Sequence, residues 1–311
     1  MKVAWVFPGQ GSQSVGMATA LLEAAPEARA IFARVDEALG FALSSIIANG
    51  PDDELTRTEH TQPAIVATSA ALVAVLRSRF PQVPAPSFVA GHSLGEYSAL
   101  VAAGALSVED AVRIVHARGR SMQEAVPVGV GAMAAVMGVE PETLDALCKD
   151  HAGTEVVSCA NFNAPGQIVI AGHAAAVARV SEAVSAHKGR AIPLKVSAPF
   201  HCALMEPAAR VVAEKLAAVP FAPLACPVVA NIDAEASQDP EVAKKKLVAQ
   251  VTGAVRWQSS VEAMAAAGVT HVIEIGPGKV LTGLVKRIAK GTALTNVFDA
   301  VSLDAYGATL S

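Results

Sequence analysis

A serine flanked by two glycines, in the stretch "GHSLGEYSAL" at residues 91–100, constrains the fold more than any other feature of this chain. The spacing Gly91-x-Ser93-x-Gly95 is the one that exposes a serine hydroxyl on a sharp turn between a strand and a helix. The apolar run "SFVA" before it and the helical pattern "EYSALVAA" after it supply that context. The sequence therefore predicts an exposed Ser93 at the carboxyl end of a buried strand.

Predicted strands and helices alternate on both sides of this turn. Helical patterns follow the glycine-rich stretch "PGQGSQ" through residue 48, and recur over 61–79 and 108–126, where a break is expected near Gly119. Continuous apolar runs predict further buried strands at 2–7, 226–232 and 270–278. Strands that alternate with helices at this spacing are typical of a parallel α/β sheet, which is the fold class we expect.

The middle of the chain has a different pattern. Strands and helices are predicted there in the order β-α-β-β-α-β, at 131–139, 141–151, 155–162, 167–172, 173–189 and 190–196. This order is the ferredoxin-like supersecondary pattern. We therefore expect a small ferredoxin-like domain over 128–197, inserted into a large α/β domain that comprises 1–127 and 198–311.

Composition and charge argue against several classes of partner and cofactor. The chain has 311 residues and a formal net charge of -4, so no extended surface for nucleic acid or anionic lipid is expected. Its longest apolar run, "AIVATSAALVAVL", is shorter than the ~18 residues of a membrane-spanning helix, and the N-terminal apolar stretch is too short for a signal peptide. The four cysteines include no C-x-x-C pair, so neither zinc nor disulfides are suggested. We expect a cytoplasmic monomer with no bound cofactor or metal.

A histidine that could activate Ser93 must come from elsewhere in the chain. His92 is adjacent, but neighbouring side chains on a sharp turn diverge, and a base needs heavy-atom reach of about 2.6–3.2 Å to the hydroxyl. His201 lies in "SAPFHCALM", where the chain crosses back from the small domain to the large one, and is the candidate base. The stretch between Ser93 and His201 offers mainly helix-surface acids as a third triad member, which argues mildly against an ordinary esterase.

Arg118 is the candidate substrate-binding residue. It lies in "HARGRSMQEAV" on a helix face that is otherwise apolar, and Gly119 beside it allows another backbone to approach. A guanidinium presented to a cleft can bind a carboxylate through two parallel hydrogen bonds, a geometry that lysine cannot copy. The alternative is an ordinary solvated arginine paired with a nearby acid.

Eight motifs in a consistent order carry a resemblance to a known family. They are "FPGQGSQ" (7–13), "TQPA" (61–64), "GHSLGEYSAL" (91–100), "RGRSMQEAVP" (118–127), "GAMAAVMG" (131–138), "NFNAPGQIVIAG" (161–172), "SAPFHCALM" (197–205) and "EIGPGKVLTGLVKRI" (274–288). Together they resemble the malonyl-CoA:acyl carrier protein transacylases of fatty acid synthesis over essentially the whole chain. The resemblance implies a large hydrolase-like α/β domain with a ferredoxin-like insertion. It also implies that the malonyl group of malonyl-CoA passes to the phosphopantetheine thiol of acyl carrier protein through a malonyl-serine intermediate, which supplies fatty acid elongation.

The resemblance also assigns roles to individual residues. It implies that Ser93 is the nucleophile, that His201 is its base, and that the backbone carbonyl of Gln250 orients this histidine. The other residues that it places at the site are Arg118 against the malonyl carboxylate, Gln10 and Leu94 as oxyanion-hole N–H donors, and Asn161 nearby. A Ser-His pair without the usual acid would then transfer the acyl group by a ping-pong mechanism.

Two further expectations concern selectivity and the carrier. Phe200, directly before His201, would occupy volume beside the malonyl C2 and disfavour a methyl branch, so malonyl should be preferred over methylmalonyl. Acyl carrier proteins are acidic, and a rim of basic residues at the domain junction could attract them; the candidates are Lys188, Arg190, Lys279, Lys286 and Arg287. Scattered solubilising lysines are an equally simple explanation.

Three alternatives remain open. A thioesterase or esterase would use the same serine with water as the acceptor, and would not need Arg118 for a neutral acyl group. A non-catalytic carrier-docking module would not need Ser93, His201, Arg118 and Gln250 together. A discrete acyltransferase of polyketide synthesis would share the chemistry, and the sequence alone does not decide which carrier is loaded.

Overall fold

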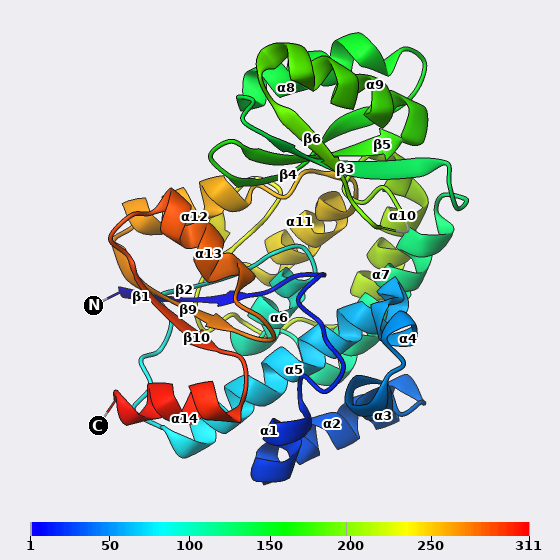
Figure 1. The fold of residues 1–311 in the computed structure, drawn as a ribbon. Coiled ribbons are helices and arrows are strands. Elements are labelled where there is room, and N and C mark those ends of the chain that lie inside the picture. Colours follow the sequence, from blue (N-terminus) through cyan, green and yellow to red (C-terminus); the bar gives the residue numbers. More distant parts are fainter. Residues whose placement is uncertain (1, 197, 311) are drawn as a thin grey trace.

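The computed structural model describes residues 2–196 and 198–310. Two sheets organise the chain: a six-stranded sheet built from its N-terminal and C-terminal parts, and a four-stranded sheet built from its middle (Figure 1). The large sheet has the strand order β10-β9-β1-β2-β7-β8. Its strands are β1 (Lys2–Phe7), β2 (Phe88–Gly91), β7 (Val228–Val229), β8 (Ala236–Ser237), β9 (Val269–Ile275) and β10 (Ala293–Val297).

The large sheet is parallel apart from its edge strand β8. Strand β1 pairs in parallel with β2 and β9, β9 pairs in parallel with β10, and β2 with β7. The two-residue strand β8 runs antiparallel to β7. The prediction of a parallel α/β sheet is therefore confirmed. Because the carboxyl ends of parallel strands meet at one edge, the loop after β1 and the turn after β2 lie next to each other.

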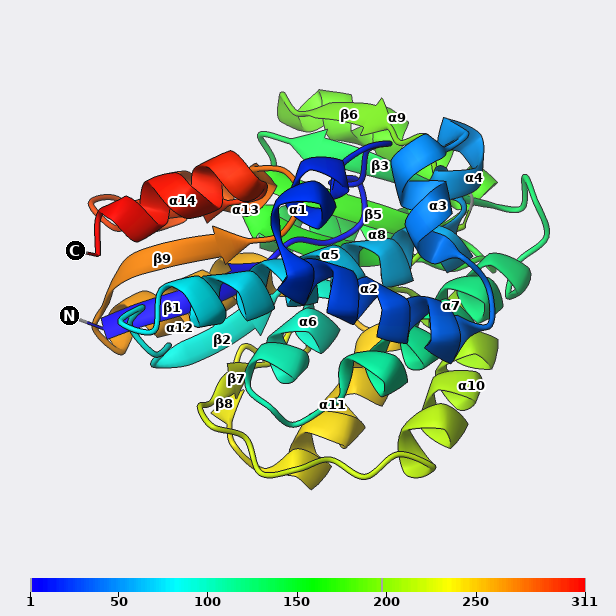
Figure 2. The same ribbon diagram turned by 90° about the horizontal axis from the view of Figure 1, so that it is seen from below.

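Helices cover both faces of the large sheet (Figures 1 and 2). Side chains alternate between the faces of a strand. Val3, Trp5 and Phe7 of β1 accordingly pack with α2, α5, α6 and α7, whereas Ala4 and Val6 pack with α12 and α13. The helices of the large unit are α1 (Thr19–Ala24), α2 (Pro26–Leu39), α3 (Leu43–Asn49), α4 (Asp52–Thr56), α5 (Thr58–Arg79), α6 (Gly95–Ala102), α7 (Val108–Glu124), α10 (Glu206–Ala217), α11 (Pro240–Thr252), α12 (Trp257–Ala266), α13 (Val280–Ile288) and α14 (Ala300–Ala308). Within the described residues, none of the helices combines the length and the apolarity that crossing a bilayer requires.

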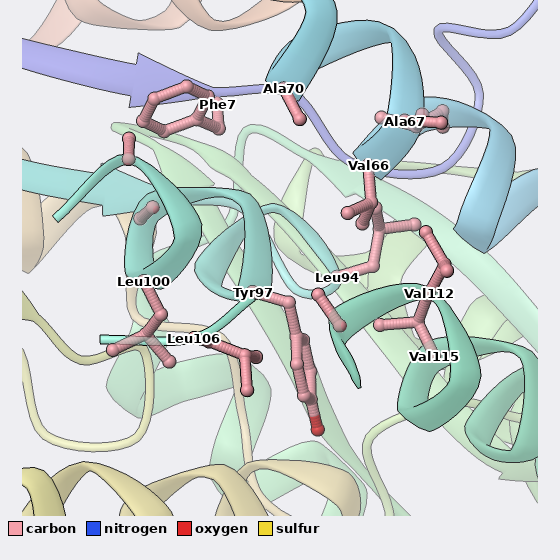
Figure 3. Close-up of a cluster of buried hydrophobic side chains, with 14 of the residues drawn as sticks. Phe7, Val66, Ala67, Ala70, Leu94, Tyr97, Leu100, Leu106, Val112 and Val115 are labelled. Carbon is pink, nitrogen blue, oxygen red and sulfur yellow. The ribbon is translucent and has the colours of Figure 1, made fainter. Parts of the chain in front are cut away.

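A cluster of apolar side chains supports the turn that carries Ser93 (Figure 3). Leu94, just before α6, packs there with Tyr97 and Leu100 of α6, with Phe7 of β1 and with α5. All four of these side chains are buried. Burying one such side chain stabilises a fold by about 1.5–3 kcal/mol. The first turn of α6 is thereby fixed to the sheet, and the position of the preceding serine is fixed with it.

The four-stranded sheet, called the small sheet below, is antiparallel and has the order β4-β5-β3-β6. Its strands are β3 (Gly131–Met137), β4 (Val157–Ala164), β5 (Gln167–His173) and β6 (Arg190–Pro193). Helices α8 (Pro141–Ala152) and α9 (Ala174–Val184) pack on it around a core of their own, which includes Leu144, Ile170 and Val180 (Figure 1). Residue 197, the predicted end of the small domain, lies outside the described residues.

Main-chain hydrogen bonds join the small sheet to the large unit. The N–H of Val255 donates to the carbonyl of Ala160 in β4 over 2.9 Å, and the N–H of Phe162 donates to the carbonyl of Val255 over 2.8 Å. A side-chain contact lies close by, because His92 Nε2 is 2.8 Å from Asn163 Oδ1. The small sheet therefore meets the large unit beside the turn that carries Ser93.

Several elements differ from the sequence-based expectation. Helix α7 runs unbroken through Gly119, where a Cβ would lie 2.5 Å from the carbonyl oxygen of Thr58. Glycine is needed there for the close approach of α5 and α7, and it does not end the helix. The strand expected over 226–232 is reduced to Val228–Val229, because the chain enters a turn at 231–233. Strands β8 and β10 do not figure in the expectation.

Candidate active site

Ser93 occupies the sharp turn between β2 and α6. Its backbone has a φ of 53°, a left-handed conformation that is costly for a residue other than glycine. A Cβ at Gly91 would lie 2.0 Å from the carbonyl oxygen of Gly95, and a Cβ at Gly95 would lie 2.3 Å from that of Phe7. Both glycines are therefore required by close backbone contacts, as the motif spacing predicts.

The side chain of Asn231 holds this turn in place. Its Oδ1 accepts a hydrogen bond from the N–H of Ser93, and its Nδ2 donates to the carbonyl of Gly91, both over 2.7 Å. Asn231 follows β7, the neighbour of β2 in the sheet, and is fully buried. These two hydrogen bonds connect the two ends of the turn through one side chain and offset part of the backbone strain at Ser93.

Ser93, His201 and the backbone of Gln250 form a connected chain. Ser93 Oγ lies 2.8 Å from His201 Nε2, and His201 Nδ1 lies 2.9 Å from the carbonyl oxygen of Gln250. A carbonyl oxygen can only accept, so Nδ1 carries the proton and Nε2 is free to accept from the serine hydroxyl. This arrangement of nucleophile, base and orienting acceptor can activate a serine for acyl transfer.

The surroundings of His201 keep its imidazole neutral. Burial, together with the positive charge of Arg118, lowers the pKa of His201 from 6.5 to about 3. The neutral ring is the form that accepts a proton from a hydroxyl. His201 also has a left-handed backbone, with a φ of 60°, so two strained residues face each other across the site. Such strain is concentrated at functional sites in proteins.

Arg118 is buried beside this pair and is not a solvated surface arginine. Its Nη2 donates to Ser93 Oγ and to Gln250 Oε1, both over 3.0 Å, and its Nη1 donates to Gln62 Oε1 over 2.8 Å. These three acceptors are uncharged, and Nε has no hydrogen-bond partner within the described residues. A buried cation with uncharged partners and an unused donor is suited to binding an anion.

A pocket of about 230 Å³ opens onto Ser93, His201 and Arg118. Three more residues expected at the site line it, namely Gln10, Asn161 and Phe200. A hollow of about 610 Å³ shares Gln10, Thr56, Lys195 and Val196 with this pocket and continues it toward α4 and α5. A narrow inner pocket with a wider mouth suits a short acyl group attached to a long carrier arm. Within the described residues, no group of three or more His, Cys, Asp or Glu side chains could hold a metal ion.

The two expected oxyanion donors lie on either side of the serine turn. Leu94 directly follows Ser93 and precedes helix α6, whose first three N–H groups donate to the carbonyls of residues 92, 93 and 94. Gln10 belongs to the loop after β1. That loop packs directly on the turn, because a Cβ at Gly9 would lie 2.6 Å from the carbonyl oxygen of His92.

His92 is bonded to the small sheet through Asn163, and its ring lies 5.9 Å from that of Trp257. Burial lowers its pKa. This placement agrees with the expectation that His92 does not act as the base for Ser93.

Four of the five basic residues expected to face the carrier lie at one end of the small sheet. We call this group the basic rim: Lys188, Arg190, Lys286 and Arg287. Arg190 pairs with Met137 across β6 and β3, and Met137 pairs with Gln167 across β3 and β5. Arg287, on α13, donates to the side chain of Gln167 and to the carbonyl of Pro165. All four are exposed, and Arg287 also ties α13 to the small sheet.

Comparison with known proteins decides the family. Residues 4–302 match the acyl transferase domain family. This chain belongs to the acyl transferase family. The malonyl CoA-acyl carrier protein transacylase of Escherichia coli strain K12 is 49% identical to it over 286 residues, which cover 92% of each chain. The protein of the same description from Bacillus subtilis strain 168 is 46% identical over 305 residues, which cover 97% of this chain and 95% of that one.

Solved structures of other acyl transferases have the same fold. An acyl carrier protein S-malonyltransferase from Vibrio cholerae superposes with a TM-score of 0.95 at 47% identity, covering 98% of this chain and all (100%) of that one. A malonyl-transacylase in complex with its type II polyketide synthase acyl carrier protein gives a TM-score of 0.95 at 45% identity, covering 99% and 100%. The resemblance to the malonyl-CoA:acyl carrier protein transacylases is confirmed.

Sequence reasoning misses one buried carboxylate of this acyl transferase site. Glu96 is 1% exposed, and its Oε2 accepts from the N–H of Asn231 and from Gln250 Nε2, both over 2.9 Å. Burial raises the pKa of Glu96 from 4.5 to about 7. The signal that could identify it is an acid at the start of a helix, "GEYSALVA", whose other residues carry no charge. A charge is rarely buried there without a partner.

Proposed function

We propose that this acyl transferase moves a malonyl group from malonyl-CoA to the phosphopantetheine thiol of an acyl carrier protein, through a malonyl ester on Ser93. The observation that carries the proposal is the buried Arg118, whose Nη2 lies 3.0 Å from Ser93 Oγ. A malonyl group on that oxygen would place its carboxylate beside a guanidinium with an unused Nε donor. The relatives described as malonyl CoA-acyl carrier protein transacylases support the same substrates.

The first half-reaction transfers the malonyl group to the enzyme. Ser93 Oγ attacks the thioester carbonyl while its proton passes to His201 Nε2, and the N–H groups of Gln10 and Leu94 stabilise the oxyanion. The intermediate then collapses, the C–S bond breaks, and His201 returns the proton to the departing sulfur of CoA. The carbonyl of Gln250, 2.9 Å from Nδ1, holds the ring in one orientation and stabilises its transient charge.

The second half-reaction repeats these steps with a new thiol. The phosphopantetheine thiol gives its proton to His201, and the sulfur attacks the ester carbonyl. The bond to Ser93 Oγ breaks, and the serine oxygen regains its proton from His201. Free CoA leaves before the carrier binds, so the kinetics are ping-pong.

Transfer competes with hydrolysis of the same ester. In this proposal, pairing of the malonyl carboxylate with Arg118 holds the ester in one position and keeps its carbonyl away from an activated water. The test is to isolate the malonyl-enzyme by rapid desalting and to follow its decay with and without acyl carrier protein. A stable ester that the carrier discharges supports the proposal, whereas rapid loss to water favours the thioesterase or esterase alternative.

The basic rim, which lies at one end of the small sheet, is proposed to attract the acidic carrier. A relative with 45% identity was solved with a polyketide synthase carrier, so a polyketide carrier is the second candidate beside that of fatty acid synthesis. The two are distinguished by the ratio of kcat/KM for purified fatty-acid and polyketide carrier proteins. A higher value for the fatty-acid carrier supports a role in supplying fatty acid elongation.

We also propose a two-domain organisation. The element order β3-α8-β4-β5-α9-β6, with the sheet order β4-β5-β3-β6, supports a ferredoxin-like domain over 128–197 inserted into a hydrolase-like domain over 1–127 and 198–311. In this proposal the enzyme acts as a cytoplasmic monomer without a bound cofactor, and the phosphopantetheine arrives on the carrier.

A further inference from the structure

A buried chain of hydrogen bonds leads from Glu96 to both functional side chains next to Ser93. Glu96 Oε2 accepts from Gln250 Nε2 over 2.9 Å. Gln250 in turn presents its Oε1 to Arg118 Nη2 over 3.0 Å and its backbone carbonyl to His201 Nδ1 over 2.9 Å. Each of these four residues is at most 4% exposed, so bulk water does not replace a lost bond.

We propose that Glu96, as a carboxylate, is a positioning residue for acyl transfer, because it fixes Gln250 and thereby the Arg118 guanidinium and the His201 imidazole. This inference rests on the proposed function. In a serine triad the acid bonds directly to the histidine. Here the carboxylate acts one residue further away, through a glutamine that contacts both the base and the substrate-binding arginine.

The reason lies in the shape of the glutamine amide. Its oxygen and nitrogen ends are nearly identical in size, so hydrogen-bond partners alone decide which end faces Arg118. Gln250 Nε2 faces the carboxylate of Glu96 and the carbonyl of Ser93, at 2.9 and 3.0 Å. The bond to the charged acceptor is roughly twice as strong as one to an uncharged acceptor. Without that charge, a flip of the amide would turn an NH₂ group toward the Arg118 cation and remove one of its acceptors.

Glu96 has two further effects on the site. It accepts from the N–H of Asn231, the residue whose side chain clips the turn at Ser93. Its negative charge also stabilises Arg118: burial lowers the pKa of Arg118, and attraction to Tyr97 and Glu96 opposes that change. Nucleophile, base and substrate-binding cation therefore all depend on one carboxylate.

The titration of Glu96 provides a signature that a purely structural role would lack. Burial raises the pKa of Glu96 from 4.5 to about 7, although hydrogen bonds from Asn231 and Gln250 oppose the rise. Because the folded pKa lies near neutrality, the carboxylate form is present above pH 7 and is lost as the pH falls. Malonyl transfer should therefore weaken through the same range.

The other titratable groups around Glu96 do not produce this signature. Those that face Glu96 or Gln250 are Arg118, Tyr97, Asp233 and His201. Arg118 remains protonated. Burial raises the pKa of the Tyr97 hydroxyl, and that of His201 is lowered to about 3. Asp233 is 2.7 Å from Lys246 Nζ in a salt bridge.

The test measures the rate at which malonyl-CoA acylates Ser93 in the wild type and in Glu96→Gln. Rapid quench and intact-mass analysis give this rate at each pH over about 5.5–9. Glutamine keeps the shape and one acceptor oxygen but lacks the charge. At the alkaline end, Glu96→Gln should be slower by about 10- to 100-fold, the scale expected when catalytic groups are misplaced by about 1 Å. The wild-type rate should fall through a midpoint near pH 7 and approach the rate of the variant, which should itself show no such fall.

Glu274→Gln is the matched control. Glu274 is also fully buried, its pKa is also raised by burial, and it accepts from the N–H groups of Leu281 and Thr282 at the start of α13. This variant should keep the wild-type acylation rate and the wild-type pH dependence. An identical loss in Glu274→Gln would mean that any buried glutamate gives the effect, and would overturn the proposal.

Three other results would also overturn the positioning role: a wild-type rate in Glu96→Gln at alkaline pH, an acid limb near pH 7 that persists in that variant, or a wild-type rate that is flat through neutrality. The last measurement needs no variant, so the proposal remains testable if Glu96→Gln does not fold. A wild-type protein that forms no malonyl adduct at any pH would instead refute the proposed function.

Discussion

Replacing Arg118 by methionine should abolish the preference for an acyl group that carries a carboxylate. The guanidinium is 1% exposed and is held by Gln62 and Gln250 at 2.8 and 3.0 Å, so it cannot move into water to avoid an incoming anion. In the acylated enzyme it would form charge-assisted hydrogen bonds with the malonyl carboxylate. Methionine fills much of the same volume without offering a donor.

The size of the effect follows from the burial of the pair. Removing one partner of a buried ion pair costs about 3–5 kcal/mol, and 1.4 kcal/mol is a factor of ten. The value of kcat/KM for malonyl-CoA should therefore fall about 150- to 4,000-fold in Arg118→Met. Acetyl-CoA has no carboxylate to lose, so the ratio of malonyl to acetyl transfer should fall by a comparable factor.

The assay measures acylation of Ser93 by malonyl-CoA and by acetyl-CoA in the same preparation of each variant. Arg120→Met, on the exposed side of the same helix, is the control, because the Arg120–Glu124 pair is 65% and 62% exposed and such pairs contribute only about 0–1 kcal/mol. It should leave both rates unchanged. Equal losses of malonyl and acetyl transfer in Arg118→Met would refute the role of Arg118 in carboxylate binding.

Further predictions concern stability, selectivity and the carrier. The pKa of His201 is lowered from 6.5 to about 3, so its contribution to stability is present above pH 6.5 and is lost as the pH falls toward 3. Between pH 7 and 4, the free energy of unfolding measured with urea should therefore fall less in His201→Gln than in the wild type. The difference should reach up to about 1.4 kcal/mol per pH unit. Phe200→Ala should raise the ratio of methylmalonyl to malonyl acylation about 10-fold or more, because one methyl group in a tight pocket is worth about 1–3 kcal/mol. An unchanged ratio in a competition assay would contradict this prediction. Lys286→Glu should raise the apparent KM for acyl carrier protein and weaken the salt dependence of this KM, while acylation by malonyl-CoA stays unchanged. An unaltered KM would show that Lys286 does not attract the carrier.

The elements that sequence analysis predicts best are those whose signal is local. Strand β1 and helix α5 are recognised because a long, mainly apolar run is buried in a folded chain. The serine turn is recognised from its local glycine spacing, in which Gly91 is required by a contact with Gly95, four residues later. Gly119 misleads for the opposite reason. Its role depends on the backbone of Thr58, some sixty residues earlier in the chain, and no local pattern reveals that α5 passes there.

The candidate site shows the same division between local and long-range information. Ser93 and His201 are chosen from a motif and from a domain crossing, and the structure places their reacting atoms 2.8 Å apart. Glu96 and Asn231 escape notice because their functions arise only when β7 and α11 pack beside β2 and α6. In the sequence, the only indication of such a network is an acidic residue in a helix that carries no other charge.

The most direct test of the account is the intact mass of the protein after brief mixing with malonyl-CoA, measured for the wild type and for Ser93→Ala. A malonyl adduct is expected on the wild type alone, and acyl carrier protein should discharge it. An adduct on Ser93→Ala would place the nucleophile elsewhere. No adduct on the wild type, with free CoA and malonate accumulating, would make the protein a hydrolase and contradict the transfer of malonyl groups to a carrier.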